Sequence, residues 1–370
     1  MFCSTVTGRP SRGLGALSSV IAVLAVAGCA ADATSPNPVK TAVGNAAGAL
    51  RADADMQQVL DAHAGLQPQP IEKLAPAQAR QQPTIADAVN ALLKQQGRST
   101  DPAVLVPGIT SRDVQIEGAA GPLPARIYTP AGTGPFPVVV YFHGGGWVIA
   151  DKQVYDGGAR GIASQANAVV VSVDYRQAPE HKFPAAWDDS LAAYKWALAN
   201  AASLKGDPRK FGLAGESAGG NLAVATAIAA RDAKLQAPLH VLAVYPVAQT
   251  SLNTESEIEN AAAKPLNRAM VKWFVDHLIR TPADTKDTRL QLTEANLQGL
   301  PPVTLINATI DPLRSDGAQL ESALKAAGVP VERKLYTGVT HEFFGTAAVV
   351  AKAKDAQAYA GQRLKAAFGQ

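Results

Sequence analysis

From residue 113 onward, hydrophobic and polar positions follow two patterns that alternate along the chain. Short runs rich in β-branched and aromatic residues are separated by longer alanine-rich stretches with apolar residues at helical spacing. The short runs predict eight strands, at residues 113–117, 125–128, 138–142, 168–173, 211–214, 239–245, 303–307 and 331–336. The longer stretches predict helices at residues 155–165, 187–200, 218–232, 315–326 and 346–367. This alternation favours an α/β fold with a mostly parallel sheet of eight strands, helices on both faces and an antiparallel start.

Two helical regions lie outside this alternation. Residues 52–103 contain two short helical patterns separated by prolines, and we expect them to form an N-terminal helical cap. Residues 104–370 form the expected main domain, with an insertion at about 249–300 that has no strand-like run but a helical stretch at 269–279. Ligands of such folds bind at the carboxyl ends of the strands, so this insertion is placed to act as a lid.

The first 51 residues have a different composition. Residues 1–28 begin weakly basic and continue as an apolar run, the pattern of a secretory signal peptide. The run ends in Val-Ala-Gly followed by Cys29, similar to the lipobox of bacterial lipoproteins, so Cys29 is expected to carry a lipid. An ordinary signal peptide with a chance cysteine is the alternative. Residues 29–51 predict a flexible tether. We expect export to the cell envelope as a lipoprotein, with the lipid as the only membrane contact, or to the periplasm or medium.

Composition and charge narrow the classes of function. The 370 residues are 47% hydrophobic and 18% charged, as in globular proteins with a large core. The formal net charge of +3 gives no case for a basic face, and therefore none for nucleic-acid binding. The cysteines are Cys3 and Cys29, so cleavage of the leader leaves neither an intramolecular disulfide nor a thiolate metal site.

A serine motif lies between a predicted strand and a predicted helix. Gly215-Glu216-Ser217-Ala218-Gly219 follows the strand at 211–214 and opens the helix at 218–232. This is the context of a nucleophile elbow, a turn so sharp that it needs small residues two before and two after the serine. A serine that only caps the helix is compatible with the same local structure. The motif predicts Ser217 as a nucleophile.

Three consecutive glycines, residues 144–146, follow His143 directly after the strand at 138–142. Backbone N–H groups of such a loop, together with that of Ala218, could form an oxyanion hole for acyl transfer. A phosphate-binding loop is one alternative, but its motifs do not occur here, and a flexible turn is the other.

A serine nucleophile needs a base. Of the histidines after Ser217, His240 lies within a predicted strand and His277 within the predicted lid helix. His341 follows the last predicted strand and precedes the last helix, which makes it the best candidate. A zinc motif beginning at His341 fails because its fifth residue is Gly345.

The base needs an acid to orient it. Asp311 follows the strand at 303–307 and could accept the imidazole N–H of His341. Asp316 is the alternative, although its position favours a role at the start of a helix. The chain order Ser217, Asp311, His341 differs from the orders of the chymotrypsin and subtilisin types.

Together these motifs resemble the hormone-sensitive-lipase-like esterases, bacterial family IV of the α/β hydrolases. The resemblance spans roughly residues 110–350 and rests on segments 143–147, 174–186, 215–220 and 311–314 and on Gly338, His341 and Phe343. It implies the α/β-hydrolase fold and a carboxylesterase that hydrolyses small-molecule esters with short to medium acyl chains, without a metal or cofactor. The chain departs from the family at Glu216, where Asp or Thr is common, and at residues 309–310, where an acid is frequent.

The resemblance also implies roles for particular residues. Ser217 would be the nucleophile, Asp311 the acid and His341 the base. The amides of Gly144, Gly145 and Ala218 would form the oxyanion hole, while His143, Glu180 and His181 would support the site.

Other functions and a substrate pocket remain open at this point. A lactonase or an aryl-amide hydrolase would use the same triad. A non-catalytic binding lipoprotein of this fold, or a structural lipoprotein of the envelope, would not use it. Met56, Leu60, Trp273 and Phe274 are candidates for an apolar pocket beneath the cap, although residues at such helical spacing more often serve packing alone.

Overall fold

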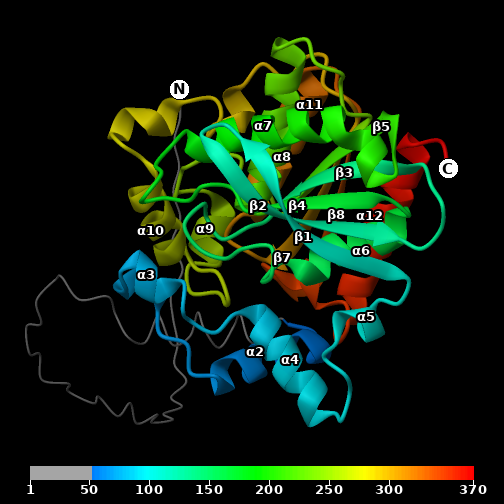
Figure 1. The fold of residues 1–370 in the computed structure, drawn as a ribbon. Coiled ribbons are helices and arrows are strands. Elements are labelled where there is room, and N and C mark those ends of the chain that lie inside the picture. Colours follow the sequence, from blue (N-terminus) through cyan, green and yellow to red (C-terminus); the bar gives the residue numbers. More distant parts are fainter. Residues whose placement is uncertain (1–51) are drawn as a thin grey trace, which may run out of the picture. The chain divides into compact units, whose positions relative to one another are not determined.

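The computed structural model describes residues 52–370, which form an eight-stranded sheet flanked by helices (Figure 1). The strand order is β1-β2-β4-β3-β5-β6-β7-β8. Strand β2 runs antiparallel to β1 and β4, and the other neighbouring pairs are parallel. The predicted signal peptide, Cys29 and the tether lie outside the described residues.

All eight predicted strands are present, with somewhat different ends. They are β1 (Ile109–Gly118), β2 (Gly121–Pro130), β3 (Phe136–Phe142), β4 (Val169–Val173), β5 (Gly206–Glu216), β6 (His240–Val244), β7 (Val303–Ile310) and β8 (Val331–Thr340). The antiparallel start predicted from the sequence is confirmed.

The helices lie in three groups along the chain. The N-terminal group is α2 (Ala54–Gly65), η1 (Ile71–Lys73), α3 (Pro76–Ala79), α4 (Ile85–Gln95) and α5 (Pro102–Leu105). The second group lies between the strands or after the last one: α6 (Asp156–Ala166), α7 (Ala185–Asn200), η2 (Ala201–Leu204), α8 (Ala218–Asp232) and α11 (Arg314–Ala326) lie between strands, and η5 (Phe343–Thr346) and α12 (Ala351–Ala367) follow β8. The 249–300 insertion holds α9 (Glu255–Glu259), α10 (Arg268–Leu278), η3 (Pro282–Lys286) and η4 (Leu292–Glu294).

The last helix begins later than the sequence predicts. A helix was expected from residue 346, but α12 starts at Ala351, and a short 3-10 turn, η5, precedes it. Phe343 and Phe344 are buried in the core and hold this turn against the fold. Val350, the residue directly before α12, is in an extended conformation, so the helix cannot continue back to η5 through it.

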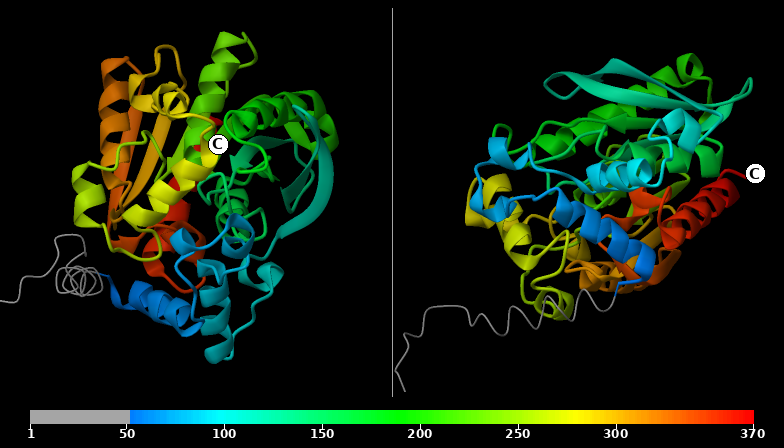
Figure 2. Two further views of the ribbon diagram at one scale, coloured as in Figure 1. Left: turned by 90° about the vertical axis from the view of Figure 1, so that its left-hand side faces the viewer. Right: turned by 90° about the horizontal axis from the view of Figure 1, so that it is seen from below.

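Successive residues of β3 point to opposite faces of the sheet, as the strand period of two requires. Val138 and Val140 belong to the core beneath α7, α8 and α11, whereas Val139 and Tyr141 belong to the core beneath α6 and α12. All four are fully buried, so each side of the sheet has its own apolar layer. Figures 1 and 2 show these helices covering the two faces. Among the helices of residues 52–370, none combines the length and apolarity needed to cross a membrane.

The N-terminal helices and the insertion lie side by side (Figures 1 and 2). Helix α4 is started by Thr84, whose hydroxyl accepts the N–H of Asp87 while the Asp87 carboxylate accepts the Thr84 N–H, a capping box. The indole N–H of Trp273 in α10 donates to the carbonyl of Leu74 at 3.2 Å, which joins the two regions. The domain boundaries given above stay predictions.

Candidate active site

The chain turns sharply at the end of β5. Ser217, with φ 57° and ψ −119°, occupies a conformation that non-glycine residues rarely adopt, and its N–H donates to the carbonyl of Val244 at 2.9 Å. A Cβ on Gly215 would collide with the backbone of Gly219, and one on Gly219 with the carbonyl oxygen of Phe142. The two glycines are therefore required by close backbone contact, and helix α8 begins at the next residue after the serine.

Three side chains from distant parts of the sequence meet at this turn. The Ser217 hydroxyl lies 3.0 Å from Nε2 of His341, and Nδ1 of His341 lies 2.8 Å from Oδ2 of Asp311. With a neutral imidazole, the serine donates to Nε2 and the Nδ1–H donates to the carboxylate. The other carboxylate oxygen accepts the N–H of Leu313 at 2.8 Å, which fixes the acid in turn.

The electrostatics of the site favour a protonated base. His341 is 3% exposed, and burial alone lowers its pKa. The charge and hydrogen bond of Asp311, together with the charges of Glu342 and Glu216, raise the pKa by more, so the pKa of His341 lies above its ordinary value. The site therefore stabilises the imidazolium that a serine nucleophile leaves behind when its proton moves to the base.

The alternative residues lie elsewhere. His240 is buried in β6 within 2.9 Å of the Thr304 hydroxyl, and burial lowers its pKa to about 4. Within α10, Nδ1 of His277 is hydrogen-bonded to the carbonyl of Trp273. Asp316 lies in the first turn of α11, where its carboxylate accepts the N–H of Ala248. None of these three makes the contact with Ser217 or His341 that a base or an acid would need.

The glycine loop follows β3, as the sequence indicates. Gly144 and Gly145 are buried there, and Ala218 is buried as the first residue of α8. Gly145 has φ 93° and lines the same cavity as Ser217 and His341. His143 supports the loop from below, because its ring stacks on Tyr175 at 4.4 Å and its Nδ1 lies 2.7 Å from the Gly144 carbonyl.

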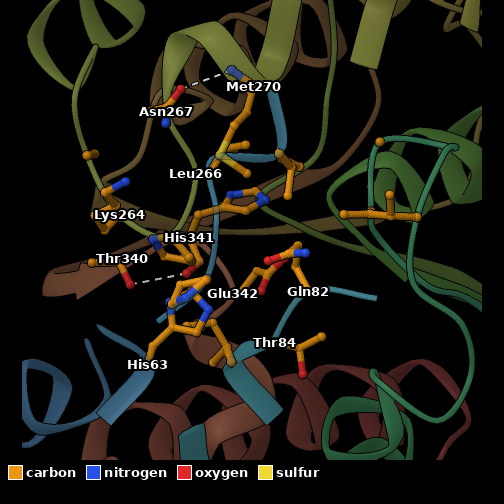
Figure 3. Close-up of a pocket in the computed structure, with 18 of the residues that line it drawn as sticks. His63, Gln82, Thr84, Lys264, Leu266, Asn267, Met270, Thr340, His341 and Glu342 are labelled. Atoms are coloured by element: carbon orange, nitrogen blue, oxygen red, sulfur yellow. Dashed lines mark hydrogen bonds between the residues drawn. The ribbon is translucent and has the colours of Figure 1, made fainter. Parts of the chain in front are cut away.

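A cavity of about 540 Å³ opens above Ser217 and His341. Figure 3 shows its walls: His63 and Thr84 from the N-terminal helices lie opposite Leu266 and Met270 from the insertion. Of the four pocket candidates, Leu60 and Phe274 line the cavity. Met56 and Trp273 are buried in packing contacts instead, as the alternative for helical spacing predicted.

Known proteins place this chain in a family. A family model described as alpha/beta hydrolase fold matches residues 139–345. The chain belongs to this family. The carboxylesterase NlhH of Mycobacterium tuberculosis is 40% identical over 292 residues, which cover 77% of this chain and 91% of that protein. The esterase LipI of the same organism is 38% identical, over 74% of this chain and 87% of its own.

Solved structures of esterases are also similar to this chain. The hyperthermophilic esterase from Pyrobaculum calidifontis is 32% identical and superimposes with a TM-score of 0.76, covering 85% of this chain and 98% of its own. The protein is thus a carboxylesterase, a serine hydrolase of the hormone-sensitive-lipase family. The two non-catalytic alternatives considered for the sequence therefore do not hold.

Some residues around the site of this esterase were not expected from the sequence. Tyr245 lies directly after β6 with its ring centroid 4.5 Å from that of His341, and Glu342 lines the cavity beside the base. Arg80 in the N-terminal region donates to both carboxylate oxygens of Glu180, at 2.8 and 2.7 Å, and so connects the cap to a residue expected to support the site. The side chain of His181, expected to act likewise, is exposed. No sequence motif marks Tyr245 or Arg80, since their contacts depend on residues far away in the chain.

Proposed function

We propose that this carboxylesterase hydrolyses small esters with short to medium acyl chains, using Ser217 as nucleophile, His341 as base and Asp311 as the orienting acid. The observation that carries the proposal is the position of His341, with Nε2 3.0 Å from the Ser217 hydroxyl and Nδ1 2.8 Å from Asp311. A cavity of about 540 Å³ with apolar side chains such as Leu266 and Met270 suits such substrates.

The reaction proceeds in two halves. Ser217 Oγ bonds to the ester carbonyl carbon while its proton passes to Nε2 of His341, and the amides of Gly144, Gly145 and Ala218 stabilise the oxyanion. The C–O bond to the alcohol then breaks, and the imidazolium returns its proton to the leaving alkoxide. Water then attacks the acyl carbon while one of its protons passes to Nε2 of His341. The bond between the acyl carbon and Ser217 Oγ breaks, His341 returns the proton to Oγ, and the carboxylic acid leaves.

A labelling experiment tests the roles of these residues. An organophosphonate should bond to Ser217, and mass spectrometry of the digested protein should find the adduct on that serine. Ser217→Ala should lose the adduct and about 10⁴- to 10⁶-fold in kcat. An adduct elsewhere, or an active Ser217→Ala variant, would contradict the assignment.

A panel of matched ester, lactone and anilide substrates over several acyl lengths decides between the esterase and its two catalytic alternatives.

We further propose that the protein is exported and that Cys29 carries a lipid anchor. The support is the lipobox-like sequence that ends at Cys29. The full-length chain expressed in a bacterium should incorporate labelled palmitate and fractionate with membranes, and Cys29→Ala should do neither. A Cys29→Ala variant that is still labelled would contradict the anchor.

A further inference from the structure

Three tyrosines and two glutamates that the mechanism does not use are hydrogen-bonded to one another near His341. Tyr141 in β3 donates its hydroxyl to Oε1 of Glu216 at 2.5 Å, and Tyr245 donates to Oε2 of the same carboxylate. Tyr155, just before α6, donates to Glu342 Oε1 at 3.1 Å. Both oxygens of the Glu216 carboxylate are therefore occupied by tyrosine hydroxyls.

Glu216 has little freedom to move. Its side chain is 1% exposed, and a Cβ on Gly158 would collide with its Oε1, so the wall opposite has no spare room. The backbone is fixed too, because Glu216 pairs with Val244 in the sheet, directly before Tyr245. The carboxylate of Glu216 and the tyrosine that binds it thus lie at the ends of two adjacent strands, β5 and β6. Glu216 is also the residue directly before the nucleophile Ser217.

Tyr245 connects this carboxylate to the base. Its hydroxyl is bound to Glu216, and its ring packs on the ring of His341 with centroids 4.5 Å apart and planes inclined at 48°. The backbone N–H of Tyr245 also donates to the carbonyl of Ile306 at 2.5 Å. The imidazole is therefore held at Nδ1 by Asp311 and on one face by a tyrosine that is itself held at both ends.

Negative charge surrounds the base on several elements. Asp311 after β7, Glu216 at the end of β5 and Glu342 beside the base all raise the pKa of His341, while burial lowers it. Burial raises the pKa of Glu216 to about 7, although both tyrosine hydrogen bonds lower it. The other charged or titratable side chains lining the cavity are on the N-terminal region and the insertion: Asp61, His63, Glu72, Arg80 and Lys264.

We propose that Glu216 is a positioning residue, which fixes the ring of His341 through Tyr245 and stabilises with its negative charge the imidazolium formed when Ser217 loses its proton. The inference rests on the role proposed above for His341. Packing alone does not explain why a carboxylate is buried in this cluster, whereas a negative charge near a base that becomes cationic has a catalytic use.

The test is the pH profile of kcat/KM for Glu216→Gln, which keeps the size of the side chain and removes its charge. With less negative charge nearby, the pKa of His341 falls, so the acid limb should move to lower pH by on the order of one unit, with a loss of about three- to tenfold in kcat. Tyr141→Phe removes one donor that stabilises the carboxylate and should move the limb in the same direction by less.

Tyr194→Phe is the matched control. Tyr194 is also a buried tyrosine, but it donates to the carbonyl of Gln236 at 2.8 Å, and its loss should leave the acid limb in place. If Glu216→Gln lowers the melting temperature and leaves the acid limb unchanged, the proposal is overturned. If Glu216→Gln does not fold, Tyr141→Phe decides by the same criterion. An active His341→Ala variant would overturn the proposed function instead, so the two failures are distinguishable.

Discussion

His341 can accept the Ser217 proton only while it is neutral, so the pH dependence of the rate reports its pKa. Burial lowers that pKa, but Asp311, Glu342 and Glu216 together raise it by more, so it lies above the ordinary value of 6.5. We expect kcat/KM for a short-chain ester to fall as the pH drops through a midpoint above 6.5. The measurement is a rate profile from pH 5 to 9, and a rate that stays flat down to pH 5 would contradict the assignment of the base.

Asp311→Asn separates the two contributions of the acid. It removes the charge that raises the pKa of His341, so the midpoint should move to lower pH. It also leaves the amide free to hold the wrong imidazole tautomer, so kcat should fall by about 10²- to 10⁴-fold. Asp316→Asn is the control, because Asp316 accepts the backbone N–H groups of Ala248 and Gln249 and is not hydrogen-bonded to the base. Equal losses in both variants would contradict the choice of Asp311.

At the scale of elements, hydrogen bonds of Arg80 connect the N-terminal helices to the segment that follows the glycine loop. Besides Glu180, its guanidinium donates to the carbonyls of Val148 and Ala178, both at 2.8 Å. The N–H of Val148 in turn donates to the carbonyl of Gly145 at 3.0 Å. One side chain at the end of α3 therefore holds the turn that carries an expected oxyanion donor.

We expect Arg80→Ala to lower kcat/KM by about tenfold to a hundredfold. The planar guanidinium makes several hydrogen bonds at once, and water molecules in its place would not hold the glycine loop in the same position. Added guanidinium should restore part of the rate, whereas Arg80→Lys should not, since an ammonium cannot bind a carboxylate and two carbonyls in one plane. Arg209→Ala, at an ion pair whose arginine side chain is 84% exposed, is the control and should behave as the wild type. A wild-type rate for Arg80→Ala would show that the contact has no part in the site.

Most of the helices and strands could be predicted because each depends mainly on a pattern in its own stretch of sequence. The continuous apolar run at β3 and the elbow at Ser217 carry their own patterns, and both are present in the structure. The interruption before α12 was missed because it depends on buried Phe343 and Phe344, whose partners lie elsewhere in the chain. The same reason hides Tyr245: its contacts with Glu216 and His341 bring together three strand ends, and no periodicity in the sequence encodes them.

For the whole molecule, a buried carboxyl that takes no part in the proposed reaction should make stability depend on pH. Glu257 in α9 is 1% exposed, and its Oε2 has no hydrogen-bond partner among the described residues. Burial, together with the nearby charges of Asp316 and Asp311, raises the pKa of Glu257 to about 8. In the unfolded chain a glutamate titrates near 4.5, so the folded protein binds this proton more tightly.

The sign of the effect follows from that difference. A raised pKa contributes stability that is fully present below pH 4.5 and is lost as the pH rises toward 8. Glu257→Gln cannot titrate, so the wild type should lose, between pH 5 and pH 8, on the order of 3 kcal/mol more of its unfolding free energy than the variant. Melting temperatures of both proteins across this range give the comparison. Glu255→Gln, in the same helix but with its side chain 86% exposed, should follow the wild-type curve, and parallel curves for Glu257→Gln and wild type would contradict the buried proton.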